Sequence, residues 1–254
     1  MKYILFFIFI FLQTYTLHGR TTGETKITAE DGIEVFQDNK YYLLKKNVKI
    51  ESDNFALEGD LIKIFFGKDL YDIKIIDADG NVKLKSLEYK INGTGAKLKF
   101  MVQNEEIYIE GLNSNLNTKD IKMFSDGNIK INNKNGNFAL SGPNSSLNSE
   151  NILIKGEQIN GSFSNKNNER EITMLDVDDD DGAYIRNGGV EMFAKEIDFD
   201  DNTSIIELKN DVKIVSESET ITGDYGTLNT ATNSYKIKSN KSKKVMIIIS
   251  ENDE

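Results

Sequence analysis

The densest group of residues that could do chemistry is a run of carboxylates near position 180. Asp176 opens the stretch DVDDDDG (176–182), and hard carboxylate oxygens are the ligands that Ca²⁺ prefers. The stretch departs from an EF-hand loop, because Asp181 stands where that loop needs glycine and Asn187 where it needs a bidentate glutamate. We therefore expect a solvated acidic turn here and no metal site.

Catalytic side chains of the common kinds are scarce. The chain has no cysteine and no tryptophan, and its one histidine, His18, lies in the first 19 residues. Residues 20–254 therefore cannot form Cys–His nucleophile pairs, Cys/His zinc sites or disulfides. The 41 acidic residues offer many carboxylate pairs of the glycosidase kind, but no local pattern singles one out. We predict no catalytic residue, no metal, no cofactor and no enzymatic activity.

The first 19 residues have the pattern of a secretory signal. Lys2 precedes an apolar run at 3–12, and Gly19 is a small residue at which a peptidase could cut. Ten apolar residues are well short of the roughly 20 that span a bilayer. We expect a secreted protein whose mature chain begins near Arg20, while a retained membrane anchor is the alternative.

The charge balance bears on the class of partner. The formal net charge is −10 at pH 7, and it becomes −11 if Lys2 is removed. An acidic chain attracts polyanions poorly, so binding to nucleic acid is not expected.

Alternation of apolar and polar residues dominates the sequence. It occurs in VKI (48–50), DIKII (72–76), NVKLKSLEYKI (81–91), AKLKF (96–100), EIYIEG (106–111), NIKI (128–131) and ILIKG (152–156). This period of two is typical of strands with one buried face. Asn-Gly or Asp-Gly pairs, which suit tight reversals, begin at residues 79, 92, 126, 135, 160 and 187. The pattern predicts an all-β protein of short antiparallel strands.

One two-strand sequence motif is repeated along the chain. Residues 44–74 align without gaps on residues 208–238 with eleven identities, and shorter copies begin at Val82 and Ile129. A single hairpin cannot bury its apolar face, so we expect the copies to stack in a twisted sandwich or jellyroll. The predicted inward face comprises Val48, Ile50, Leu57, Ile62, Ile64, Ile73, Ile75, Val82, Leu84, Tyr89, Ile91, Leu98, Phe100, Ile129, Ile131 and Leu140.

The chain offers one place for a domain division. A polar stretch at 164–171, expected to be a loop or hinge, and the acidic stretch at 176–182 could separate two stacked halves. We expect one β-domain over residues 20–254, in which such halves would meet near 164–182.

Two segments resemble the OstA/LptA family of periplasmic lipopolysaccharide-transport proteins. Residues 26–65 (KITAEDGIEVFQDNKYYLLKKNVKIESDNFALEGDLIKIF) are similar to the family's opening strands of the types I-x-A-[ED], G-N-V-x-[IV] and [LI]-x-[GA]-[DN]. Here Lys46 replaces the usual glycine before Asn47 and Val48. Residues 205–249 are similar to the end of such proteins, while 145–200 match poorly.

The resemblance implies an OstA-type β-jellyroll with a V-shaped groove. It implies a periplasmic carrier that shields lipid A acyl chains on the way from the inner to the outer membrane, without a cofactor. The inward face above would line the groove and bind lipid. Copies and the OstA-like proteins of both membranes would join head to tail by strand pairing, through edge residues Ile27, Ile33, Val35, Val245, Ile247 and Ile249.

Three other hypotheses remain open. The chain could be the inner-membrane-anchored, LptC-like partner of the same pathway, which keeps its N-terminal helix. It could be a secreted β-rich enzyme that acts on polysaccharides, which would require an essential carboxylate pair. It could also be a structural or adhesive surface protein. The sequence also leaves open whether the apolar interior is a groove or a packed core.

Overall fold

The computed structural model describes residues 24–68, 72–88, 90–149, 152–166, 169–240 and 244–249. The expected signal segment and Tyr89 lie outside the described residues. No helix in those ranges is both long and apolar enough to cross a membrane.

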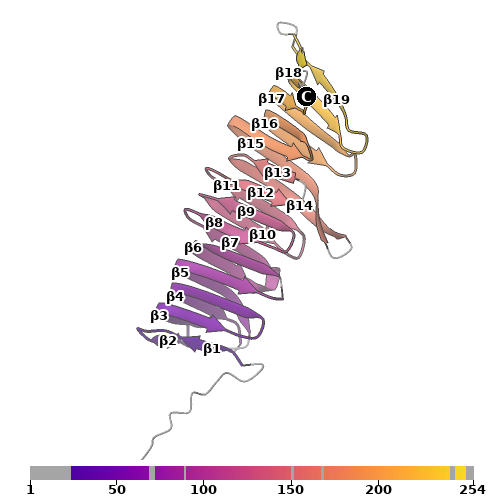
Figure 1. Ribbon diagram of the computed structural model, residues 1–254. Coiled ribbons are helices and arrows are strands. Elements are labelled where there is room, and N and C mark those ends of the chain that lie inside the picture. Colours follow the sequence, from indigo (N-terminus) through magenta and orange to yellow (C-terminus); the bar gives the residue numbers. More distant parts are fainter. Residues whose placement is uncertain are drawn as a thin grey trace, which may run out of the picture.

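The described chain is all-β, as predicted, and its strands stack along one long axis (Figure 1). Every pairing between neighbouring strands is antiparallel. The elements are β1 (Lys26–Thr28), β2 (Ile33–Phe36), β3 (Tyr41–Glu51), β4 (Phe55–Phe66), β5 (Ile73–Ser86), β6 (Ile91–Met101), the 3-10 turn η1 (Val102–Asn104), β7 (Glu106–Glu110), β8 (Ser114–Asn117), β9 (Ile121–Ser125), β10 (Asn128–Asn132), β11 (Asn137–Ser141), β12 (Ser146–Ser149), β13 (Ile152–Lys155), β14 (Gln158–Lys166), β15 (Glu169–Asn187), β16 (Val190–Asp200), β17 (Ile205–Val215), β18 (Glu219–Asn229), β19 (Ser234–Lys238) and β20 (Met246–Ile249).

Most long strands bend at an interior corner. The pairing of β3 with β4 skips from Lys45 to Val48, and the pairing of β17 with β18 skips from Lys209 to Val212. At both corners two consecutive residues have positive φ: 61° and 46° at positions 46 and 47, and 64° and 54° at positions 210 and 211. Asn and Asp tolerate this conformation better than most residues. The repeated motif is thus a bent strand followed by the strand that pairs with it.

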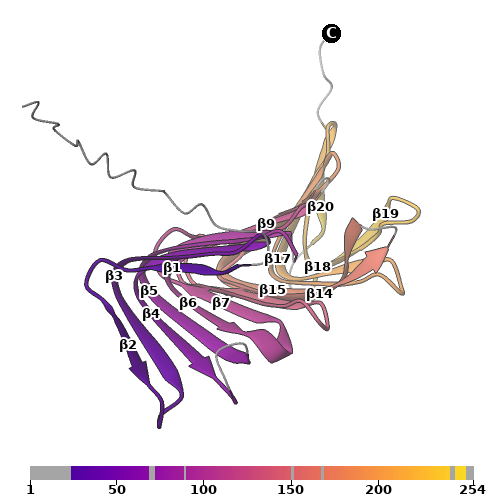
Figure 2. The same ribbon diagram turned by 90° about the horizontal axis from the view of Figure 1, so that it is seen from below.

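The bends divide the sheet into two arms, which form two layers that spread apart when viewed along the stack (Figure 2). A strand that bends contributes one segment to each arm. The first arm contains β2, β7, β10, β11, β14, β19 and residues 41–45, 61–66, 73–79, 97–101, 169–178, 196–200, 205–209 and 225–229. The second arm contains β1, β8, β9, β12, β13, β20 and residues 48–51, 55–59, 82–86, 91–95, 183–187, 190–194, 212–215 and 219–223.

Several expected turns are different features. Asn135-Gly136 and Asn187-Gly188 do connect strands in hairpins, and Asp126-Gly127 lies between β9 and β10. The expected hairpin turn at Asp79-Gly80 is wrong, because these residues form the corner inside β5, where φ is 78° at Gly80. The pairs that begin at 92 and 160 lie inside β6 and β14.

The acidic stretch 176–182 is not a turn between strands. It lies within the 19-residue strand β15, where the pairing with β16 skips from Asp178 to Ala183, so Asp179, Asp180 and Asp181 form the corner of that strand. A loop or hinge is expected at 164–171, but residues 164–166 and 169–171 are paired with one another in β14 and β15. Pairing between those strands extends over residues 158–178. The division into halves near this point stays a prediction.

The predicted inward face coincides with the core at most positions. Val48, Leu57 and Ile91 are almost fully buried between the arms, and buried neighbours continue the same face along the stack. In β5 the buried residue is Ile76, whereas Ile75 is half-buried. The register shift between Phe65 and Phe66, which places Ile73 opposite Phe66, accounts for this exchange.

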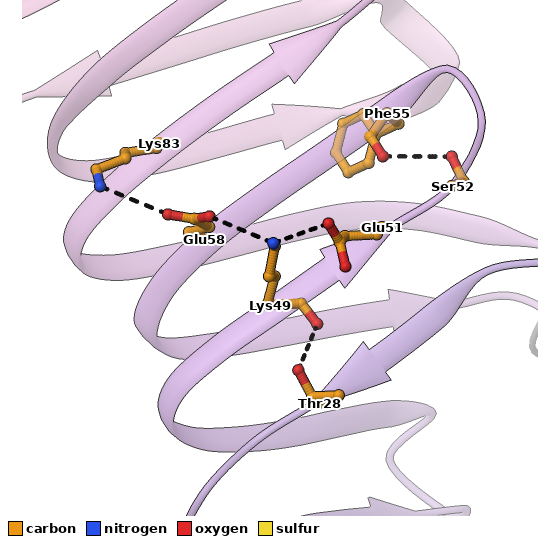
Figure 3. A network of polar contacts seen from close by, with 7 residues as sticks. All are labelled: Thr28, Lys49, Glu51, Ser52, Phe55, Glu58 and Lys83. Carbon is orange, nitrogen blue, oxygen red and sulfur yellow. Dashed lines mark hydrogen bonds and ion pairs between the residues drawn. The ribbon is translucent and has the colours of Figure 1, made fainter. Parts of the chain in front are cut away.

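The outward faces carry charged ladders across neighbouring strands. On the second arm, Lys49 Nζ lies 2.8 Å from a carboxylate oxygen of Glu51 and 3.9 Å from one of Glu58, and Lys83 Nζ lies 3.6 Å from Glu58 (Figure 3). Thr28 of β1 donates a hydrogen bond to the carbonyl of Lys49 at 3.5 Å. Solvent screens such pairs, so they hold the register and keep the face soluble more than they stabilise the fold.

The close approach of strands at Gly161 generates a stability prediction. A Cβ at this position would lie 2.5 Å from the carbonyl oxygen of Met174 and 2.5 Å from Cζ of Phe138. Gly161→Ala should therefore lower the free energy of unfolding by about 1–3 kcal/mol in chemical denaturation. Gly189→Ala, where a Cβ meets nothing within 4 Å, is the control and should change it little. Equal effects at both sites would contradict this packing.

Candidate functional site

A cavity of about 630 Å³ lies between the two arms in the C-terminal half of the stack. We call it the inter-arm cavity. Aliphatic and aromatic side chains from both arms form much of its wall. The second arm provides Ile152, Ile154 and Ile185, and the first arm provides Ile172, Leu175, Phe199 and Ile206. Each arm therefore contributes an apolar patch to the wall. The rest of the wall is formed by polar residues, among them Asn148, Ser149, Asn187, Asp201 and Thr230.

The bend of β15 is what places these side chains opposite one another. Ile172 and Leu175 precede its corner and lie on the first arm, while Ile185 follows the corner and lies on the second arm. Ile152 and Ile154 belong to β13, which pairs with β15 after that corner. Ile154 is fully buried, and Ile152 and Phe199 are half-buried, so the cavity begins where the packed core ends.

Charged residues line part of the cavity. Lys119, Asp120 and Lys122 come from the end of the second arm at β8–β9, and Arg170 and Glu171 come from the start of β15. We call these five residues the mouth. The Arg170 backbone N–H donates to a carboxylate oxygen of Asp120 at 3.3 Å, which ties the first arm to the second at this point. Lys119 Nζ lies 3.8 Å from Asp120.

Arg170 occupies an unusual position for an arginine. It stands two residues before the buried Ile172, on the inward face of β15. Its guanidinium carbon lies 4.5 Å from the ring centroid of Phe163, and its Nη2 donates to the side-chain oxygen of Asn133. Phe163 is itself stacked on Phe138, with ring centroids 6.1 Å apart.

The electrostatics of Arg170 are dominated by burial. Desolvation lowers the pKa of its guanidinium, and the nearby Asp120 carboxylate opposes that shift. Nη1 is buried and has no hydrogen-bond partner in the described part of the chain. A buried charged donor without a partner costs more free energy than a paired one, so this atom calls for an explanation.

The predicted groove residues do not form the wall of this cavity. Val48, Ile62, Leu98 and Leu140 are packed in the dry core, as are most of the others. Their contact with lipid stays a prediction. Except for Ile206, the apolar cavity residues lie between 152 and 199, within the stretch 145–200 where the match to family patterns is poor. The alternation in ILIKG (152–156) marks Ile152 and Ile154 as strand residues, but no pattern shows that packing ends beside them.

The predicted edge residues lie at the two ends of the stack. Ile27, Ile33 and Val35 are exposed in β1 and β2, and both strands pair with β3. Ile247 and Ile249 are exposed in β20, which pairs with β18, and Val245 just before it is exposed as well. Each end therefore presents apolar strand residues to solvent, and their use in assembly stays a prediction.

The acidic residues of β15 and its neighbours form a ladder on the outer face of the first arm. Asp176 lies opposite Asp198, and Asp178 lies opposite Glu196. Lys209 of β17 offsets part of this charge, with Nζ 2.5 Å from Asp198. The described residues contain no group of three or more His, Cys, Asp or Glu side chains that could hold a metal ion.

Asp178 gives this ladder a measurable pH dependence. Desolvation and the charges of Asp176, Glu196 and Asp198 raise the pKa of its carboxyl above the ordinary value of 3.8. The folded chain binds this proton more tightly than the unfolded chain does, so stability falls as pH rises from the ordinary pKa to the raised pKa, and the loss stays constant at higher pH. Protonation of Asp178 at lower pH therefore restores this part of the folding stability.

Asp178→Asn should accordingly raise the denaturation midpoint at pH 7, and its advantage should shrink as pH is lowered through the range in which Asp178 takes up its proton. Asp180→Asn removes the same charge from the same corner and is the control, with a smaller expected gain. Denaturation curves measured from pH 3 to pH 8 test this. A loss of stability in Asp178→Asn at pH 7 would show that the repulsion is not significant.

The similarity of this chain to known proteins is found among solved structures. No protein-family model matches the chain, and no curated protein sequence matches it. Among solved structures, the chain is similar to LptH, the LptA-homologous periplasmic component of the conserved lipopolysaccharide transport device from Pseudomonas aeruginosa. That similarity has 8% sequence identity and a TM-score of 0.23, and it covers 90% of this chain and 96% of that chain.

Proposed function

We propose that this protein is a periplasmic lipopolysaccharide carrier that shields lipid A acyl chains in the inter-arm cavity during transport from the inner to the outer membrane. The observation that carries the proposal is the cavity itself, which has an apolar patch on each arm and charged residues in the mouth. The OstA-like patterns at residues 26–65 and 205–249 supply the class of lipid. Carriage of this kind requires no catalytic group.

The size and chemistry of the cavity suit an acyl chain. Its volume of about 630 Å³ falls within the roughly 300–1,000 Å³ typical of ligand sites in proteins. Each methylene group that leaves water for such a wall contributes about 0.8 kcal/mol. Several methylene groups in contact with Ile152, Ile172 and Phe199 would therefore suffice for a reversible complex, which a carrier needs.

The charge of the protein limits how the lipid is held. At −10, the chain as a whole repels the anionic head group of lipopolysaccharide. Burial of acyl chains must therefore supply most of the affinity, with the head group at the mouth or outside it.

The ends of the stack support the second part of the proposal, a bridge between membranes. Within the described residues, β1 and β2 pair only with β3, and β19 and β20 pair only with β18, so the strands at both ends can add further strands by backbone hydrogen bonds. We propose that β1 and β2 of one copy pair with β19 and β20 of another, or with OstA-like proteins of the two membranes. The apolar residues at 27, 33, 35, 245, 247 and 249 would be covered in such contacts.

Site-resolved crosslinking tests the carrier role. A photo-reactive phenylalanine at position 152 or 199, in protein purified from its native envelope, should form adducts with acylated lipid that mass spectrometry identifies as lipopolysaccharide. The same residue at Leu112, which is 76% exposed outside the cavity, is the control and should form none. The absence of lipid adducts at both cavity positions in folded protein would refute the proposal. Adducts with another acylated lipid would correct the cargo.

A further inference from the structure

We infer that Arg170 is the recognition site for an oxyanion, a phosphate or a carboxylate, that the lipid in the inter-arm cavity carries at its polar end. This inference rests on the proposed function, because it assigns the head-group contact of the same cavity. It starts from an atom that the fold leaves unexplained: Nη1 of Arg170 is buried and has no hydrogen-bond partner among the described residues.

The neighbouring residues fix the position of the guanidinium but leave its donor Nη1 without a hydrogen bond to any described residue. Phe163 lies under it at 4.5 Å, and the side-chain oxygen of Asn133 accepts a hydrogen bond from Nη2. An aromatic face and an amide oxygen are both uncharged partners. Arginine presents its donors in a planar fork that matches the two oxygens of a carboxylate or phosphate, so a fixed fork with one donor unused suits an oxyanion.

The nearby carboxylates are already engaged. Asp120, whose charge acts on the Arg170 guanidinium, accepts a hydrogen bond from the Arg170 backbone N–H and pairs with Lys119. Glu171 and Asp201, which also line the cavity, each have an interaction partner. Lys122 forms no ion pair with any residue that the structure describes, so it adds a second cation at the mouth.

The position of Arg170 fits an amphiphile in one orientation. The side chain lines the inter-arm cavity beside Ile172, at the end where the mouth lies. An acyl chain along Ile172, Leu175 and Phe199 would place its polar end at Arg170. Because Nη1 is covered, the oxyanion reaches it only if the two arms part slightly at the contact between Arg170 and Asp120. Binding should therefore loosen that contact.

Three probes distinguish the contribution of an alkyl chain from that of a negative charge: dodecyl phosphate, dodecyl maltoside and inorganic phosphate. The full chain should bind dodecyl phosphate more tightly than dodecyl maltoside in calorimetry. Arg170→Gln should weaken the binding of dodecyl phosphate about tenfold, as expected for the loss of a hydrogen bond to a charged group, and leave that of dodecyl maltoside unchanged. Inorganic phosphate should bind much more weakly than dodecyl phosphate.

Two further variants guard against a structural explanation. Arg186→Gln removes an exposed arginine from the same strand and should change neither affinity. Asn133→Asp keeps Arg170 but places a carboxylate beside its guanidinium, so it should also abolish the preference for dodecyl phosphate. This variant tests the inference even if Arg170→Gln does not fold.

The possible results distinguish the two proposals. Equal weakening of both amphiphiles by Arg170→Gln, or no preference for dodecyl phosphate in the unmodified chain, would overturn the oxyanion site while leaving the carrier intact. Failure of both amphiphiles to bind the unmodified chain would refute the carrier itself. Inorganic phosphate that binds as tightly as dodecyl phosphate would also overturn the head-group assignment, since the site would then accept a free anion.

Discussion

The bend inside the long strands is the constraint on which the rest of this structure depends. A straight antiparallel strand would place all of its inward residues on one layer, and a second chain segment would be needed to cover them. Some strands bend at two consecutive residues with positive φ, such as Lys46-Asn47 or Asn210-Asp211. Such a strand has one segment in each arm, and the two segments cover each other. Each new strand extends both layers at once, so the core grows along the stack axis.

The corner also explains how one cavity can have an apolar patch on each arm. Because β15 continues through residues 179–182 from the first arm to the second, its buried residues before and after the corner belong to facing walls. Side chains near the corner are buried between the arms, whereas Ile152 and Phe199 are half-buried and line the cavity. The Asp120–Arg170 contact limits how far the arms separate at one end.

The sequence predicts the strands well and the corners poorly. Alternation is a local property, so Val48, Ile50, Val82 and Leu84 are placed correctly in the core. An Asp-Gly pair favours positive φ equally in a hairpin and in a corner, so its chemistry cannot tell which one occurs at residue 79. The cavity depends on distances between strands far apart in the chain, which no local pattern contains. One local feature does indicate the cavity: Arg170, near Ile172, places a charge on an otherwise apolar face of the strand.

The most direct test of the central claim is paramagnetic broadening of isoleucine methyl signals by a fatty acid that carries a nitroxide on its chain. Because broadening falls steeply with distance, it reports which methyl groups lie beside the bound chain. We expect strong broadening at Ile152, Ile172 and Ile206, and little at Ile62 and Ile91, which are packed in the N-terminal core. Uniform weak broadening, or broadening confined to the exposed end strands, would contradict a lipid site between the arms.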